Sequence, residues 1–152
     1  MEERLRFKVW NKRLKKMYDV RSMSYYKNQI VRIEVCEKYE NGESDILIFD
    51  EYERMIDECV LLQCTGMKDD NNILIYEGDI IEIWKMAGNI HKNMFVKWRD
   101  SQSSFRLYDM TFATPQKIPY GDKRSMGAVT SMIIIGNIYE NPELLEKDVQ
   151  DE

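Results

Sequence analysis

Two short stretches decide the fold: residues 64–69 (CTGMKD) and residues 75–80 (IYEGDI). Each contains a glycine that can take the positive φ of a sharp reversal, and an aspartate that can accept hydrogen bonds from a turn backbone. The second stretch leads into residues 80–84 (IIEIW), a β-branched and aromatic run typical of a strand. We therefore expect one strand to end at the first glycine and another to begin after the second. The residues expected to form these turns are Thr65, Gly66, Gly78 and Asp79.

The polar run between the two stretches, residues 68–72 (KDDNN), has the composition of a calcium-binding loop. Counted from Asp70, Asn72 fits the third ligand position of such a loop. Leu74 and Ile81 fail the fifth and twelfth positions, which need oxygen ligands. We therefore interpret the run as a structural loop whose side chains bond to nearby backbone N–H groups.

The chain offers little with which to build an active site. Glu77 and Asp79 are two residues apart. No neighbouring group is expected to separate their pKa values, as a general acid and a general base would require. His91 is the single histidine, and an ordinary surface or edge residue is expected there. No phosphate-binding glycine loop or nucleophile elbow occurs. We predict that the protein is not an enzyme and uses no cofactor; Glu77, Asp79 and His91 would be the first residues to test for activity.

Cysteine usage argues against a metal site. Cys36, Cys59 and Cys64 are an odd number without metal-ligand spacing, and a closed zinc site would need all three together with His91. We expect reduced, mostly buried thiols, as in a cytosolic protein. No apolar run approaches the ~20 residues of a membrane span, and no apolar segment follows the first residues as in a secretory signal. These features predict a cytoplasmic protein with no membrane partner.

Charge is segregated along the chain of 152 residues. Residues 1–27 hold nine basic and three acidic residues, a net of +6, and residues 28–152 hold 13 basic and 24 acidic residues, a net of −11, which together give the overall −5. Such asymmetry indicates either an anionic partner or self-association. The candidate interaction residues are Arg4, Arg6, Lys8, Lys12, Arg13, Lys15 and Lys16.

Several separated blocks of the chain resemble the YopX family of phage and prophage proteins. The blocks lie in order over nearly the whole chain, and none carries catalytic residues. The resemblance implies a C-terminal SH3-like β-barrel, a homo-oligomer and the cytoplasm of a bacterial host, in a family of unknown function. Residues 36–55 contain no matching block. The matching blocks are residues 6–10 (RFKVW), 15–18 (KKMY), 62–69 (LQCTGMKD), 75–80 (IYEGDI) and 135–145 (IGNIYENPELL).

Patterning predicts a mainly β protein with three parts. Residues 1–58 are expected to form an N-terminal β-hairpin and strand extension, residues 59–147 an SH3-like barrel core with a C-terminal helix, and residues 148–152 an acidic tail. In the extension, alternating strands are expected at residues 5–10, 14–20, 29–35 and 46–49, with a turn at Asn41-Gly42. Residues 50–58 are compatible with a short helix capped by Asp50 or with a loop.

In the core, residues 91–98 and 105–108 are expected to form a hairpin. Residues 131–139 form the last strand, which we place centrally because its apolar run is continuous. Gly136 lies in this strand, and Asn141 and Pro142 then begin a short helix as its N-cap and first helical residue. The long irregular segment at residues 114–127 is the first place where we expect a partner site.

The leading functional hypothesis is a non-enzymatic phage accessory protein that self-associates or binds a phage or host protein. The basic hairpin of one copy would dock on an acidic face of another. The alternative is nucleic-acid binding by the same hairpin, in which Phe7, Trp10 and Tyr18 lie among the basic residues. Self-association is favoured over this alternative because the sequence pI is about 5.1.

Overall fold

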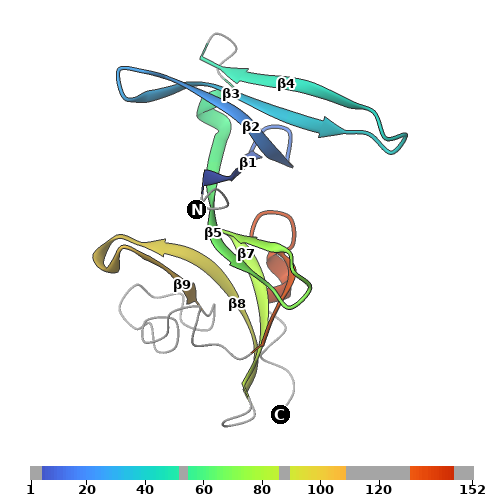
Figure 1. Cartoon of the computed structure of the whole chain (residues 1–152), viewed down its shortest axis with the longest axis vertical. Helices are drawn as coiled ribbons and strands as arrows, with labels where there is room; N and C mark the ends of the chain where they lie inside the picture. The colour runs from blue at the N-terminus through green and yellow to red at the C-terminus, as the bar shows by residue number, and fades with distance from the viewer. Residues whose placement is uncertain (1–4, 52–54, 86–89, 109–130, 146–152) are drawn as a thin grey trace. The chain divides into compact units, whose positions relative to one another are not determined.

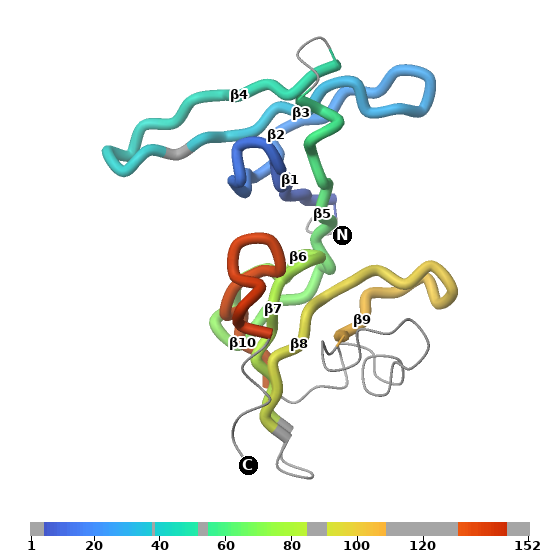
Figure 2. The backbone as a smooth tube through the Cα atoms, turned by 180° about the vertical axis from the view of Figure 1, so that it is seen from behind, coloured from blue at the N-terminus to red at the C-terminus, as the bar shows by residue number. Residues whose placement is uncertain are grey.

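The computed structural model describes residues 5–51, 55–85, 90–108 and 131–145, which form two compact units, Met1–Gln63 and Cys64–Glu152. Figures 1 and 2 show that both units are built of antiparallel strands, and that the helical segments among the described residues are single short turns. The expectation of a mainly β protein is confirmed. Arg4, the long segment 114–127 and the tail 148–152 lie outside the described residues.

The first unit is built on long strands. Its sheet has the order β4-β3-β2-β1-β5, and β5 continues on to pair with β6 of the second unit. The second strand extends well past the expected Val20, because Ser22 to Tyr26 pair with β3. The strands of this sheet are β1 (Phe7–Asn11), β2 (Lys16–Tyr26), β3 (Gln29–Lys38), β4 (Ser44–Asp50) and β5 (Cys59–Lys68), and β6 (Leu74–Tyr76) belongs to the second unit.

One face of this sheet forms the core of the first unit. The alternation of β1 to β4 directs large apolar side chains to that face, and the ring of Tyr18 meets that of Phe49 edge-on at 5.6 Å. Burying such side chains contributes about 1.5–3 kcal/mol each. The buried members of this core are Val9, Tyr18, Ile33, Val35 and Phe49.

Of the two alternatives for residues 50–58, the helix capped by Asp50 is not formed. Asp50 pairs with Arg32 at the end of β4, so its backbone is extended and cannot begin a helix. The only helical turn between β4 and β5 in the described residues is the 3-10 turn η2 (Ile56–Glu58). The β-branched and aromatic run before Asp50 therefore extends the strand further than the capping pattern predicted.

The second unit is an open sheet of four strands in the order β10-β7-β8-β9. The described residues form no closed barrel, so the expected SH3-like barrel is not confirmed. The strands are β7 (Asp79–Lys85), β8 (Ile90–Arg99), β9 (Ser104–Tyr108) and β10 (Ser131–Asn137). The buried core on one face consists of Ile75, Ile81, Ile83, Met94, Val96, Leu107 and Met132.

Two expectations about strands need correction. The strand at Cys64 does not end at Gly66: β5 continues to Lys68, and Gly66 at φ +78° lies where the register with β6 shifts. This is the conformation of a β-bulge, which bends a strand without ending it. The last strand, β10, lies at the edge of the described sheet and not at its centre, because it pairs with β7 alone.

The chain after β10 folds back over this sheet as the 3-10 turn η6 (Pro142–Leu145). A Cβ atom on Gly136 would lie 2.6 Å from Oδ1 of Asn141 and 2.9 Å from Cδ1 of Leu144, so only glycine permits this close approach. The amide of Asn93 donates to the carbonyl of Leu144 at 2.8 Å, which joins the turn to β8. Leu145 is buried.

Candidate interaction surfaces

The polar loop of residues 68–72 closes the outer edge of β10. The backbone N–H of Asp70 donates to the carbonyl of Met132 at 2.9 Å, and the Asp70 carboxylate accepts from the hydroxyl of Ser131 and from the N–H of Met132. Oδ2 of Asp69 accepts from the N–H of Ile134 at 3.1 Å. The loop thus occupies backbone groups that an edge strand would otherwise present to other chains.

Asp69 also organises the loop itself. Its Oδ1 accepts from the N–H groups of Asn71 at 3.0 Å and Ile73 at 2.9 Å, and the residue is only 5% exposed. Asn72 takes the left-handed conformation at φ +66°. Both oxygens of the Asp69 carboxylate accept hydrogen bonds from backbone N–H groups. The carboxylate therefore stabilises the backbone of the loop and its contact with β10.

The turn before β7 uses its acidic residues in the same way. Gly78 has φ +85°, and Oδ2 of Asp79 accepts from the N–H of Tyr76 at 2.8 Å. Oε1 of Glu77 accepts from the N–H of Trp98 on β8 at 3.1 Å. At the β5 bulge, the hydroxyl of Thr65 donates to the carbonyl of Ile75 at 2.9 Å. The two acids therefore bind different main-chain groups and do not face a common point.

Asn141 and Pro142 take the expected positions before and at the start of the C-terminal turn, but the Asn141 side chain bonds to a group outside the turn. Oδ1 of Asn141 accepts from the N–H of Asn137 at 3.3 Å, so this side chain reaches back to the end of β10. The carbonyl of Asn141 accepts from the N–H of Leu144 at 3.1 Å, and Pro142 is the first residue of η6. Asn141 thus closes the β10–η6 connection by a route that the capping pattern did not predict.

The basic turn, which we define as residues 12–16, is held rigidly. The buried Asn11 accepts at Oδ1 from the N–H of Leu14 at 2.8 Å, and the N–H of Lys12 donates to the carbonyl of Glu58 at 2.8 Å. Lys15 has φ +51°. The turn exposes four of the seven candidate interaction residues, while Arg6 is exposed before β1 and Lys8 is half-buried within it. The four are Lys12, Arg13, Lys15 and Lys16.

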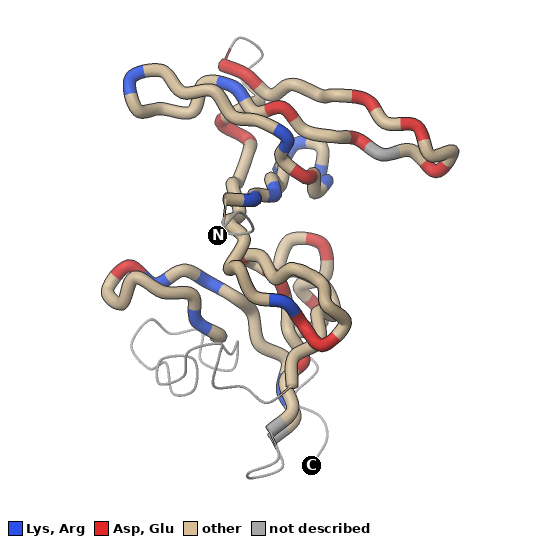
Figure 3. The backbone as a smooth tube through the Cα atoms, in the orientation of Figure 1, with Lys and Arg blue, Asp and Glu red and all other residues tan. Residues whose placement is uncertain are grey.

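An acidic turn lies at the same end of the sheet as the basic turn. In an antiparallel sheet the β1–β2 and β3–β4 connections fall on one end, and an ion pair between Lys16 and Glu37 joins them here. Figure 3 shows acidic residues along the β3–β4 hairpin and basic residues at β1 and its turn. Beyond Glu37 the hairpin exposes Glu40, Glu43 and Asp45. Part of the charge segregation seen in sequence is therefore balanced within one unit.

The outer strand of this sheet presents apolar side chains to solvent. In the described residues β4 has one neighbour, β3, to which it is paired from Ser44 to Asp50. Leu47 and Phe49 point to the core face, while Ile46 and Ile48 on the opposite face are 48% and 40% exposed. An outer strand with exposed apolar side chains and one described neighbour is a surface to which another strand can add.

His91 is half-exposed and has two side-chain partners on β7. Its ring stacks on that of Trp84 with 4.2 Å between centroids, and its Nε2 lies 2.7 Å from Oε1 of Glu82. Glu82 and His91 are diagonal neighbours across the β7–β8 pair. The histidine therefore acts as a cross-strand link, in keeping with its expected place on the surface.

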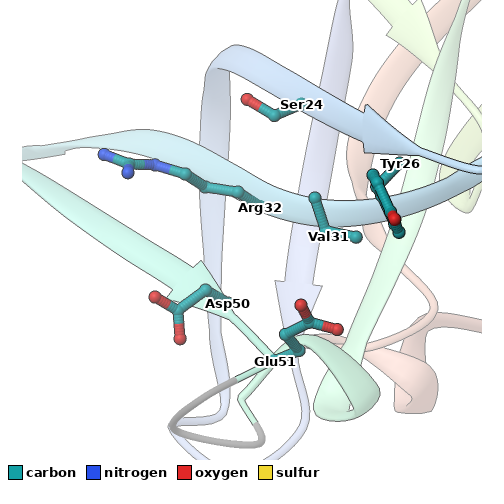
Figure 4. Close-up of a pocket in the computed structure, with 6 residues that line it drawn as sticks. All are labelled: Ser24, Tyr26, Val31, Arg32, Asp50 and Glu51. Carbon is teal, nitrogen blue, oxygen red and sulfur yellow. The ribbon is translucent and has the colours of Figure 1, made fainter.

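A pocket of about 430 Å³ opens where β2, β3 and the end of β4 meet. Figure 4 shows that the Glu51 side chain points toward Tyr26, while the guanidinium of Arg32 points away from both. Arg32 instead donates to Glu34 at 2.8 Å. The charged groups of this pocket do not converge, so it has no evident binding chemistry. Its lining residues are Ser24, Tyr26, Val31, Arg32, Asp50 and Glu51.

Metal-ligating groups are not gathered in the described part of the chain, where no three His, Cys, Asp or Glu residues are placed to hold an ion. Cys36, Cys59 and Cys64 are free thiols. Burial raises the pKa of the Cys59 thiol, although a hydrogen bond from Asn11 opposes this. None of the helical turns among these residues has the length and apolar character that a membrane crossing needs.

One surface was missed by the sequence reasoning. On the β8–β9 hairpin, Lys97 pairs with Arg106 and Phe95 pairs with Tyr108, so cations and aromatic rings share one face. The signal was present as alternation, with Phe95, Lys97 and Arg99 at every second position. It was overlooked because the basic N-terminal segment dominates the charge pattern of the whole chain.

These features define a class: a two-unit antiparallel β protein in which Asp69, Asp70, Glu77 and Asp79 accept hydrogen bonds from turns and strand edges. A family model for YopX protein matches residues 6–146. The chain belongs to the YopX family.

Two solved structures are similar over nearly their full length. Protein EF1440 from Enterococcus faecalis is 24% identical with a TM-score of 0.57, and the match covers 92% of this chain and 96% of that one. Protein yopX from Bacillus subtilis is 19% identical with a TM-score of 0.57, and the match covers 93% of this chain and 98% of that one. At these identities the likeness shows the fold alone. A search of curated proteins gave no match.

Proposed function

We propose that this chain is a non-enzymatic phage or prophage accessory protein that acts by self-association, with the β4 edge as the contact surface. The phage setting rests on the family resemblance. The contact surface rests on one observation: Ile46 and Ile48 are exposed on an outer strand that has a single neighbour in the described sheet. Proteins normally protect such edges by a charge, a bulge or a partner.

A second copy of the chain can supply the missing strand through two-fold antiparallel pairing of β4 with β4. The pleat selects the register. Centred on Leu47, the pairing puts Ile46 opposite Ile48 of the second copy, and both lie on the outward face of the joined sheet. A shift by one residue would place core-facing side chains opposite outward-facing ones, which the pleat does not permit. The contact is isologous and closes as a dimer.

Salt dependence separates this contact from docking of the basic turn on an acidic face. The β4 pairing brings together two acidic strands, so screening by salt should strengthen it. Docking of the basic turn on Glu40 and Glu43 would instead be weakened by salt. The ion pair between Lys16 and Glu37 within one copy already reduces the charge available for docking.

The test is light scattering during gel filtration, over a range of protein and salt concentrations. We expect the wild-type protein to associate, the Ile46→Lys/Ile48→Lys variant to be monomeric, and the control Ile73→Lys to behave as wild type. Ile73 is 54% exposed and lies in the other unit, which makes it a matched control. A wild-type monomer throughout would overturn self-association. Association that persists in the double variant, or dissolves with salt, would overturn the β4 surface.

A further inference from the structure

We propose that the outward face of the β8–β9 hairpin binds single-stranded nucleic acid. Cross-strand pairing defines this face. Val96 pairs with Leu107, and both are buried in the core of the second unit. The alternate positions therefore face outward. The outward positions are Phe95, Lys97 and Arg99 on β8, and Ser104, Arg106 and Tyr108 on β9.

Two cations of this face, Lys97 and Arg106, are not held by an acidic side chain of the described residues. Neither Lys97 nor Arg106 forms an ion pair with any residue that the structure describes. The nearest acid in sequence, Asp100, accepts at Oδ1 from the indole N–H of Trp98 at 2.9 Å. Residues 90–108 hold four basic residues and one acid, and Glu77, whose carboxylate accepts from the N–H of Trp98 at 3.1 Å, adds a second acid; the local balance is still basic in a chain whose net charge is −5. Because salt screens charges more than about 10 Å away, an anion at this face is attracted mainly by the local excess of positive charge.

Two polar atoms on the same face lack hydrogen-bond partners. Nε of Arg106 and Oγ of Ser104 are buried from solvent and have no partner in the described structure. Such groups are destabilising unless they gain a bond. A small rotation of either side chain toward an arriving phosphate oxygen would supply the missing acceptor, and an arginine donates to phosphate through two parallel N–H groups.

The aromatic rings of Phe95 and Tyr108 favour a ligand with unpaired bases, which can stack on them. The rings of Phe95 and Tyr108 lie 5.7 Å apart at a tilt of 30°, next to the Lys97–Arg106 pair, and both are half-buried. Residues two apart on a strand are spaced by ~6.6 Å, comparable to successive phosphates in an extended single strand. Aromatic platforms beside cations bind bases by stacking and phosphates by charge. A duplex keeps its bases paired and cannot use the platform.

The experiment is fluorescence anisotropy with a labelled oligothymidylate, on the full chain at low and moderate salt. We expect binding that weakens with salt, with a log–log slope of about −2 for three contacted phosphates. Lys97→Ala/Arg106→Ala should lower affinity at least tenfold, and Tyr108→Ala about fivefold, whereas Tyr108→Phe should bind as wild type. The matched control is Lys12→Ala/Arg13→Ala/Lys15→Ala, which removes cations from the basic turn and should leave affinity unchanged.

The alternatives are resolved in the same experiment. Equal binding of a duplex or of polyglutamate would overturn the single-strand assignment, as would the absence of binding at low salt. Loss of binding in the basic-turn control but not in Lys97→Ala/Arg106→Ala would place the site in the first unit and overturn the proposal. Circular dichroism of each variant separates loss of the site from loss of fold. The Ile46→Lys/Ile48→Lys variant should bind as wild type, so failure of self-association leaves this proposal standing.

Discussion

Asp69 and Ile134, which are 65 positions apart in the chain, are joined by a hydrogen bond of 3.1 Å from the backbone N–H of Ile134 to Oδ2 of Asp69. The other carboxylate oxygen binds the N–H groups of Asn71 and Ile73. One buried side chain therefore shapes its own loop and covers the outer edge of β10. The edge of one sheet is closed in this way, while the β4 edge of the other is open in the described residues.

Replacing Asp69 should destabilise the second unit strongly. Asp69→Ala leaves three backbone N–H groups without their acceptor, and we expect a loss of about 2–4 kcal/mol in the free energy of unfolding. Asp69→Asn should lose less, because its amide retains one oxygen acceptor. Asn71→Ala is the control, since the Asn71 side chain is exposed and only its backbone N–H bonds to Asp69, and it should cost under about 1 kcal/mol. Urea unfolding measures all three variants; equal losses in Asp69→Ala and Asn71→Ala would contradict the assigned role.

The hydrogen bonds of local turns can be predicted from the sequence because the residues that form them are close together in the chain. Gly78 takes positive φ and Asp79 bonds to Tyr76, all within four residues. The contact between Asp69 and Ile134 was not accessible, since nothing in either segment names the other. Counting along the sequence led to the interpretation of the polar loop as structural, but it could not identify the distant strand β10 to which the loop bonds.

The place of β10 was misjudged for a related reason. A continuous apolar run is typical of a strand covered on both faces, and that pattern placed residues 131–139 centrally. The faces of β10 are indeed largely covered, but an apolar run says nothing about how many strands flank it. Side chains of the polar loop bond to the second edge of β10, where a neighbouring strand would otherwise pair. The apolar periodicity of a strand carries no information about such a contact.

A second prediction compares two glycines with nearly the same backbone. Gly78 and Gly42 have φ of +85° and +86°, so alanine pays a similar left-handed penalty of about 1–2 kcal/mol at each. A Cβ at residue 78 would lie 3.0 Å from Cε2 of Tyr139, while one at residue 42 meets nothing within 4 Å. Gly78→Ala should therefore cost about 1 kcal/mol more than Gly42→Ala in urea unfolding. An equal loss of unfolding free energy in both variants would mean that the Tyr139 side chain moves aside at no cost.

Alkaline pH should weaken the fold partly through Tyr139. Burial raises the pKa of Tyr139, and the nearby charge of Glu77 adds to the effect. Its pKa in the fold is thus above the unfolded value of about 10, so its stabilisation is complete below that pH and is lost as pH rises through the folded value. Tyr139→Phe should lose less stability than wild type between neutral and strongly alkaline pH. Tyr25→Phe, at an exposed position, should follow wild type; parallel curves for all three proteins would contradict the coupling.

The final prediction concerns Gly136, whose missing side chain admits η6. A Cβ there would lie 2.6 Å from Oδ1 and 3.0 Å from Cβ of Asn141, so Gly136→Ala must push the turn away and should cost about 1–3 kcal/mol. Asn141→Gly alone loses the hydrogen bond to Asn137 and should cost about 1 kcal/mol. In Gly136→Ala/Asn141→Gly the added methyl occupies the vacated space, so the double variant should be more stable than the sum of the single losses predicts, by about 1 kcal/mol. Strict additivity in urea unfolding would show that Leu144, at 2.9 Å, is the contact that excludes alanine.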